Sequence, residues 1–173
     1  MRRYAKAAGL IFGVLFIIVI LAAQQASSSL TTIIIVRHAE RGPDQGVNTP
    51  ITEKGRERAA ELARVLKDAG IQRIIVSEYI RTRQTVEPLA TALGIEPEAV
   101  PVARNVDALA ARLGELKGET VLVISHHGRI EPLVEKLGGG KVTLTDASYD
   151  NIFILTLPAS GPPRLVTVKY GAR

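Results

Sequence analysis

The chain alternates between short, continuous apolar runs and longer segments in which apolar residues recur every three or four positions. Short runs rich in β-branched residues predict strands buried on both faces, and recurrence at helical spacing predicts amphipathic helices. The strand patterns cover residues 33–36, 71–76, 120–124, 152–157 and 165–170. The helix patterns cover residues 53–69, 81–93, 106–116 and 130–137.

The order of these elements predicts the fold class. Strands that alternate with helices form right-handed crossovers, which place parallel strands in a sheet with helices on both faces. Thr52 is a favoured N-cap for the first helix, and Gly70 ends the same pattern. The last two strands are joined directly by a loop, so we expect them to be antiparallel. The sequence therefore predicts an α/β fold for residues 30–173, with three α/β/α layers around a mainly parallel central sheet.

Residues 1–29 have a different pattern from the rest of the chain. Basic residues precede a continuous apolar run over 10–23, and small or polar residues follow it. This order is typical of an export signal. The apolar run also reaches the lower limit of length for spanning a bilayer, so the segment fits either a cleaved signal or an uncleaved N-terminal membrane anchor. In both cases the basic flank stays in the cytoplasm, and we expect residues 30–173 in the periplasm or at the extracellular face.

Charge and composition limit the partners. The formal net charge is +5, and removing the three basic residues of the leader, Arg2, Arg3 and Lys6, leaves +2. A charge this small does not indicate binding to nucleic acid. The sequence contains no cysteine, so disulfides, thiolate ligands and thiol nucleophiles are excluded.

Histidine and arginine residues follow the predicted strands. Arg37 and His38 come directly after the first strand, Arg81 lies just beyond the second, and His126 and His127 follow the third. Open α/β sheets bind ligands beyond the carboxyl ends of their strands, so we expect these side chains to meet at one edge. Arginine forks match the oxygens of a phosphoryl group. A neutral imidazole can attack phosphorus and a second, protonated imidazole can hold a phosphoryl oxygen, and His38 and His126 fit these two roles.

Four motifs occur in order along this part of the chain. They are Arg37-His38-Ala39-Glu40, Pro50 to Ala59, Ser77 to Thr85, and Val123 to His126. Together they resemble the motifs of the histidine phosphatase superfamily, also called phosphoglycerate mutase-like, and the resemblance covers nearly all of residues 33–170. It implies that His38 is the phosphorylated nucleophile and that no metal or organic cofactor takes part. It also implies that the phosphate pocket is completed by Arg37, Arg81 and His126. The implied activity is hydrolysis of a phosphomonoester or a phosphoprotein through a phosphohistidine intermediate.

One part of the larger members of this family has no clear equivalent in the sequence. These members carry a long insertion with a glutamate that protonates the leaving group, and the segment from Arg83 to Ser125 is too short to hold it. Asp107 and Glu40 are the candidates for this acid, although a helix N-cap and a pocket-edge position are simpler interpretations of them. A domain without the insertion should have an open site, which favours a phosphatase over a mutase.

Two other interpretations compete with an active phosphatase. His38, His126 and His127 could form a metal site, but no carboxylate stands at a recognisable ligand spacing, so we expect none. A catalytically silent phosphate-binding module of the cell envelope would keep the pocket but lack an acid. Retention of all four pocket residues favours the enzyme. His126 takes the motif position, so we expect His127 only to border the pocket.

Overall fold

The computed structural model of the protein describes residues 30–101 and 105–171. The predicted export signal or anchor lies outside these residues. Within them, no helix is both long enough and apolar enough to cross a membrane.

The observed elements match the predicted order. The strands are β1 (Thr31–Arg37), β2 (Arg73–Val76), β3 (Glu98–Ala99), β4 (Thr120–Ser125), β5 (Asn151–Leu157) and β6 (Arg164–Lys169). The helices are the short 3-10 helix η1 (Gly46–Asn48), α2 (Glu53–Leu66), α3 (Ile80–Leu93), α4 (Val106–Glu115) and α5 (Ile130–Lys136). The sequence pattern did not predict β3 or η1, because elements of two and three residues are too short to show a hydrophobic period.

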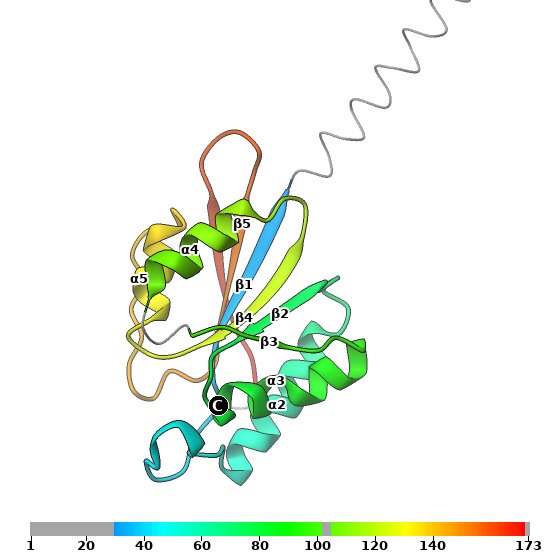
Figure 1. Ribbon diagram of the computed structural model, residues 1–173, viewed down its shortest axis with the longest axis vertical. Coiled ribbons are helices and arrows are strands. Elements are labelled where there is room, and N and C mark those ends of the chain that lie inside the picture. The colour runs from blue at the N-terminus through cyan, green and yellow to red at the C-terminus, as the bar shows by residue number, and fades with distance from the viewer. Residues whose placement is uncertain (1–29, 102–104, 172–173) are drawn as a thin grey trace, which may run out of the picture.

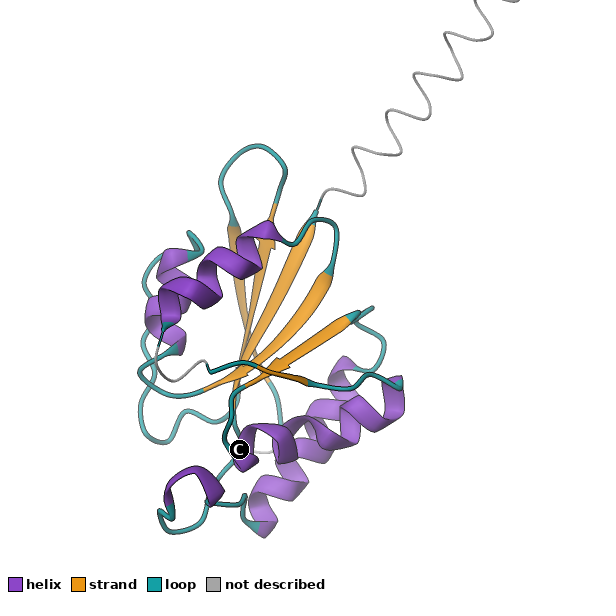
Figure 2. Cartoon of the chain, in the orientation of Figure 1, coloured by secondary structure: helices purple, strands orange, loops and turns teal. Residues whose placement is uncertain are grey.

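The central sheet has the strand order β3-β2-β4-β1-β5-β6. The first four strands of the chain are mutually parallel, and β5 pairs antiparallel with both β1 and β6. Helices α2 and α3 lie on one side of the sheet, and α4 and α5 lie on the other (Figure 1, Figure 2). The three-layer α/β/α fold with a mainly parallel sheet and an antiparallel final pair is therefore confirmed.

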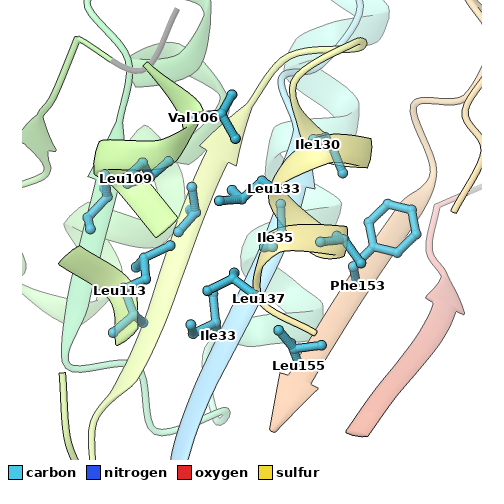
Figure 3. Packing of buried hydrophobic residues seen from close by; sticks show 14 of the residues in the cluster. Ile33, Ile35, Val106, Leu109, Leu113, Ile130, Leu133, Leu137, Phe153 and Leu155 are labelled. Atoms are coloured by element: carbon cyan, nitrogen blue, oxygen red, sulfur yellow. The ribbon is translucent and has the colours of Figure 1, made fainter. Parts of the chain in front are cut away.

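Alternate side chains of β1 enter two separate hydrophobic cores. Ile33 and Ile35 pack under α4 and α5 (Figure 3), whereas Ile34 and Val36 pack under α2 and α3. All four are almost completely buried. A strand covered on both faces has no polar face, which explains why its sequence is a continuous apolar run.

Two local features fix the chain just beyond β1. Thr52 caps α2, where its side chain accepts a hydrogen bond from the backbone N–H of Gly55 at 3.1 Å. A Cβ atom on Gly55 would overlap the carbonyl oxygen of Glu40, so glycine lets the first turn of α2 pack directly on this segment. The end of β1 is thereby held between β4 on one side and the start of α2 on the other.

Candidate active site

A cavity of about 330 Å³ lies at the carboxyl ends of β1, β2 and β4. It is lined by Arg37, His38, Arg41, Tyr79, Arg81, His126, His127, Arg129 and Asp146. The four residues predicted to form a phosphate pocket therefore meet here, and His127 borders them as expected. A slightly larger cavity, of about 390 Å³, lies at the end of α3. Its lining contains no histidine, so we assign the site to the strand ends.

Parallel pairing of β1 and β4 brings the two histidines of the motifs together. Arg37 and Ser125 are partners in the register, and the backbone N–H of His38 donates to the carbonyl of Ser125 at 3.0 Å. The next residue of each strand end is a histidine. As a result, the ring centroids of His38 and His126 lie 5.2 Å apart.

His38 has the properties of a nucleophilic imidazole. The residue is 3% exposed, and its Nδ1 lies 2.8 Å from the carbonyl oxygen of Ala39. Since a carbonyl can only accept, Nδ1 carries the proton and Nε2 keeps its lone pair. Burial lowers the pKa of His38 to about 4, and the positive charges of Arg81 and Arg37 act in the same direction. The ring is therefore neutral at neutral pH.

His126 is held in place by a serine. Its Nε2 lies 2.9 Å from the Oγ atom of Ser77, a residue at the end of β2 to which the sequence analysis assigned no role. Burial, with smaller contributions from the neighbouring His38 and the charge of Arg81, lowers the pKa of His126 to about 3. The prediction that His126 is protonated is therefore wrong for the protein without a bound ligand. A bound phosphoryl dianion would oppose this shift, since negative charge stabilises an imidazolium.

We expect the free energy of unfolding to fall as the pH is lowered from about 6.5 to about 4. Histidines of the unfolded chain bind protons near pH 6.5, whereas His38 and His126 in the folded protein stay neutral until about pH 4 and about pH 3. The unfolded state binds more protons over this interval and gains stability. Urea unfolding at several pH values measures the effect. His38→Asn should have a shallower dependence, and identical dependences would contradict the assignment.

Arg37 and Arg81 each present a cationic donor with no partner. The Nη1 atom of Arg37 donates to the carbonyls of Thr145 and Asp146 at 3.1 and 2.9 Å, and Nη1 of Arg81 donates to Gly46 at 3.2 Å. The Nε atoms of both arginines are buried without a hydrogen-bond partner among the described residues. Buried cationic donors are normally satisfied, so this pair fits the oxygens of an anion.

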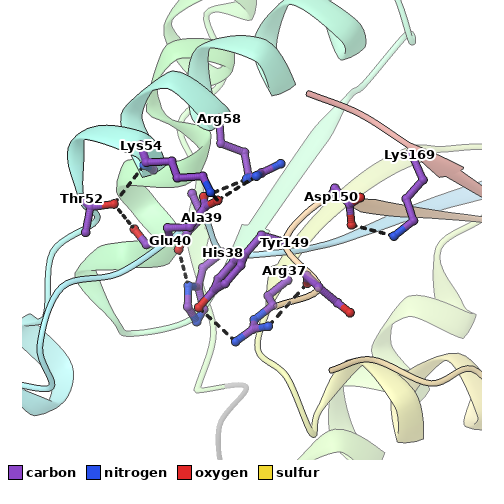
Figure 4. A network of polar contacts seen from close by, with 12 residues as sticks. Arg37, His38, Ala39, Glu40, Thr52, Lys54, Arg58, Tyr149, Asp150 and Lys169 are labelled. Atoms are coloured by element: carbon purple, nitrogen blue, oxygen red, sulfur yellow. Dashed lines mark hydrogen bonds and ion pairs between the residues drawn. The ribbon is translucent and has the colours of Figure 1, made fainter. Parts of the chain in front are cut away.

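Two tyrosines orient these arginines, and the sequence analysis did not identify them. The Arg37 guanidinium lies 4.0 Å from the ring centroid of Tyr149, whose hydroxyl accepts from Nη2 at 3.3 Å (Figure 4). The Arg81 guanidinium lies 4.0 Å from the ring of Tyr79. Tyr79 lies between Ser77 and Arg81 in the third motif, and this position is the sequence signal that could have identified it as a site residue. Tyr149 lies far along the chain, and only the folded structure brings it to Arg37.

Glu40 does not act as the predicted acid in this geometry. Its carboxylate accepts two hydrogen bonds from Arg58, both at 2.7 Å (Figure 4), and Glu40 is not among the residues that line the cavity. Burial raises the pKa of Glu40, but the bonds from Arg58 outweigh it and bring the pKa below its ordinary value. The carboxylate is therefore ionised at neutral pH and has no proton to give to a leaving group.

Asp107 is also absent from the cavity lining. Its side chain is 75% exposed and pairs with Lys136 on α5. The simpler interpretation of Asp107 as a helix N-cap is wrong as well, because Asn105 caps α4 by accepting from the N–H of Ala108 at 2.9 Å. Of the predicted site residues, Arg37, His38, Arg81 and His126 thus line the cavity, whereas Glu40 and Asp107 do not.

We expect Glu40→Gln to lower the free energy of unfolding by about 3 kcal/mol, because it leaves the charge of Arg58 buried without its partner. The side chains of Arg58 and Glu40 are only 10% and 14% exposed. Glu53→Gln is the matched control, since Glu53 pairs with Arg56 at the surface and such pairs contribute less than about 1 kcal/mol. Urea denaturation compares the two variants. Equal, small losses would show that the buried pair contributes little.

No group of three or more histidine, aspartate or glutamate side chains within residues 30–101 and 105–171 could hold a metal ion. The alternative of a metal site at His38, His126 and His127 therefore has no support from the geometry.

Comparisons with known proteins agree with this geometry. The model of the histidine phosphatase superfamily, branch 1, matches residues 33–108. The chain is 40% identical over 68 residues to the probable phosphoglycerate mutase GpmB of Shigella dysenteriae, a match that covers 36% of this chain and 32% of that protein. For the protein of the same name from Cronobacter sakazakii, identity is 35% over 79 residues, covering 42% and 37%. The chain thus spans about a third of the length of these curated relatives.

Among solved structures, the protein histidine phosphatase SixA complexed with tungstate is similar over most of its length. The TM-score is 0.69 and the sequence identity is 26%, with 80% of this chain and 96% of SixA covered.

Proposed function

The chain belongs to the histidine phosphatase superfamily, and we propose that it is a phosphohydrolase that cleaves a phosphomonoester or a phosphoprotein through a phosphohistidine intermediate. The observation that carries the proposal is the arrangement around His38. A neutral imidazole with its Nε2 lone pair free lines the same cavity as two arginines whose buried Nε donors have no partner in the described part of the chain. This combination provides a nucleophile and fixed positive charge for a phosphoryl group.

The proposed reaction has two steps. In the first, Nε2 of His38 attacks phosphorus and the bond to the leaving oxygen breaks, while Arg37, Arg81 and His126 hold the other phosphoryl oxygens. In the second, water attacks phosphorus and the phosphorus–nitrogen bond breaks, which releases phosphate and returns His38 to its neutral form. The Nδ1–H bond to the Ala39 carbonyl keeps the ring in the tautomer that both steps need.

Hydrolysis is favoured over a mutase reaction by the open cavity. A mutase must hold its phosphorylated intermediate away from water until the second transfer. The residues that line this cavity include the exposed Arg129 and the exposed Asp146. Water therefore has access to a phosphorylated His38.

The direct test uses the full chain with para-nitrophenyl phosphate, whose leaving group departs without a proton. The proposal expects release of nitrophenolate with many turnovers per molecule. Binding of inorganic phosphate without turnover would instead identify a catalytically silent phosphate-binding module. A wider panel of phosphorylated metabolites, sugars, lipids and phosphopeptides would then identify the substrate.

We further propose that the domain acts outside the cytoplasm, on the basis of the leader at residues 1–29. A reporter that is active only in the periplasm, fused after Ser29, should be functional. Activity of a cytoplasm-only reporter at the same position would show that the leader does not direct export.

A further inference from the structure

The proposed reaction lacks a proton donor for the leaving group. An alkoxide leaving from phosphorus needs a proton in the transition state, and a positioned acid typically accelerates such a step by about 100-fold to 10,000-fold. Glu40 is ionised and bound to Arg58, and Asp107 lies outside the cavity lining. His38 uses its only N–H on the Ala39 carbonyl. The donor must therefore come from the other residues of the cavity.

Most side chains that line the cavity cannot supply this proton at neutral pH. Arginine does not release a proton in proteins, and phenols are weak acids at neutral pH. An efficient acid has a pKa near the working pH, and imidazole is the side chain with this property. The rings of His38 and His126 are assigned to attack and to phosphate binding. His127 is the remaining imidazole of the lining.

The ring of His127 is held between two carboxylates. Its Nδ1 lies 3.0 Å from Oδ1 of Asp146, and its Nε2 lies 3.6 Å from Oε1 of Glu131. Both carboxylates belong to segments that hydrogen bonds hold in place. The backbone carbonyl of Asp146 accepts a hydrogen bond from Arg37, and Oε2 of Glu131 accepts one from the N–H of Gly128 at 2.9 Å. Both are ion-pair distances, and Nε2 is the nitrogen that lies farther from its carboxylate, so we assign proton exchange with a ligand to Nε2.

The depth of the residues in the cavity indicates where the leaving group lies. Arg37, His38 and His126 are 7%, 3% and 9% exposed, so a phosphoryl group bound by them is at the inner end. The His127 side chain is 35% exposed and that of Asp146 is 97% exposed, which places them at the mouth. A substrate whose phosphoryl group is at the inner end must direct the rest of its structure toward the mouth. His127 therefore lies toward the mouth, where the rest of the substrate must lie.

We propose that His127, positioned by Asp146, is the acid that protonates the leaving group, an inference that rests on the proposed phosphatase reaction. As Nε2 of His38 forms its bond to phosphorus, the bond to the substrate oxygen breaks and that oxygen takes the proton from Nε2 of His127. The alcohol leaves with the proton, and His127 becomes neutral, with its remaining proton on Nδ1, the ring nitrogen nearer to Asp146. In the second step the attacking water gives its proton to Nε2 of His127, which restores the starting form.

The test measures the first step alone, in single turnovers with the full-length protein in excess over substrate. His127→Asn keeps an amide donor for Asp146 but has no proton to transfer. With glycerol phosphate, we expect this variant to release alcohol at least about 100-fold more slowly than the wild type. With para-nitrophenyl phosphate, we expect a change of less than about threefold, because nitrophenolate needs no proton. This unchanged rate also shows that the variant is folded.

The Asp146 carboxylate supplies a second variant with a matched control. Asp146→Asn should slow the release of alcohol from glycerol phosphate but not the release of nitrophenolate from para-nitrophenyl phosphate. The matched control is Asp150→Asn, because the Asp150 carboxylate pairs with Lys169, and we expect it to change neither rate. Equal losses of His127→Asn on both substrates would show that His127 binds the phosphoryl group, which overturns the proposal. The proposal would also be overturned if the wild type released alcohol from glycerol phosphate no faster than His127→Asn does. A wild type that cleaves neither substrate would instead refute the phosphatase reaction itself.

Discussion

His38→Asn should reduce turnover of every phosphorylated substrate to the uncatalysed background. In the proposed mechanism, Nε2 of His38 forms the covalent bond to phosphorus, and this role cannot pass to His126, whose Nε2 lies 2.9 Å from the Oγ atom of Ser77. The protein should be labelled by a substrate with a radioactive phosphoryl group, and the label should be stable to alkali and labile to acid, as expected for a phosphohistidine. The variant should show neither turnover nor label.

The fold of this variant can be checked independently of activity. His38 contributes to the sheet through its backbone N–H, which the substitution keeps. We therefore expect an unchanged far-ultraviolet circular dichroism spectrum and retained binding of inorganic phosphate. Substantial hydrolysis by His38→Asn, or acid-labile label in that variant, would refute the covalent mechanism.

Arg81→Ala should lower kcat/KM by about 100-fold to 1,000-fold, the usual effect of removing one fixed donor to a charged transition state. The loss should be similar for aryl and alkyl phosphates, because in the proposed mechanism Arg81 binds phosphoryl oxygens that both substrates share. This equal loss distinguishes a phosphate ligand from the leaving-group acid.

Arg83→Ala is the matched control for Arg81→Ala. Both residues are arginines in the first turns of α3, but Arg83 pairs with the exposed Glu96 at 2.9 Å and does not line the active-site cavity. We expect Arg83→Ala to retain the kcat/KM of the wild type within about twofold, since surface pairs contribute little. Similar losses in both variants would mean that a general loss of positive charge, and not the donor at Arg81, explains the effect.

The sequence could predict much of the fold because the signals are local. The continuous apolar run over 33–36 predicted a strand buried on both faces, and β1 has that environment. Thr52 was predicted to cap the following helix, and the structure shows the bond. The position of Arg37, His38, Arg81 and His126 after three strands predicted their meeting, because parallel strands end at one edge of a sheet.

The acid could not be predicted in the same way. Asp107 and Glu40 were chosen because they lie near a helix start or near the nucleophile in the sequence. Whether a carboxylate faces a cavity or an arginine depends on which elements pack against it, and here Arg58 of α2 binds the Glu40 carboxylate. Sequence proximity to a catalytic residue therefore does not predict availability for catalysis.

The sequence by itself determined the order of the elements, the burial of the first strand on both faces, and the edge where the reactive side chains meet. These depend on hydrophobic period and on residues next to strand ends. Only the tertiary structure decided the protonation state of His126, the orientation of Arg37 by Tyr149, and the contact of His127 with Asp146. The burial of a side chain and the charge around it depend on neighbours from distant parts of the chain. These neighbours come together only when the loops after α5 and β2 pack against the end of β1.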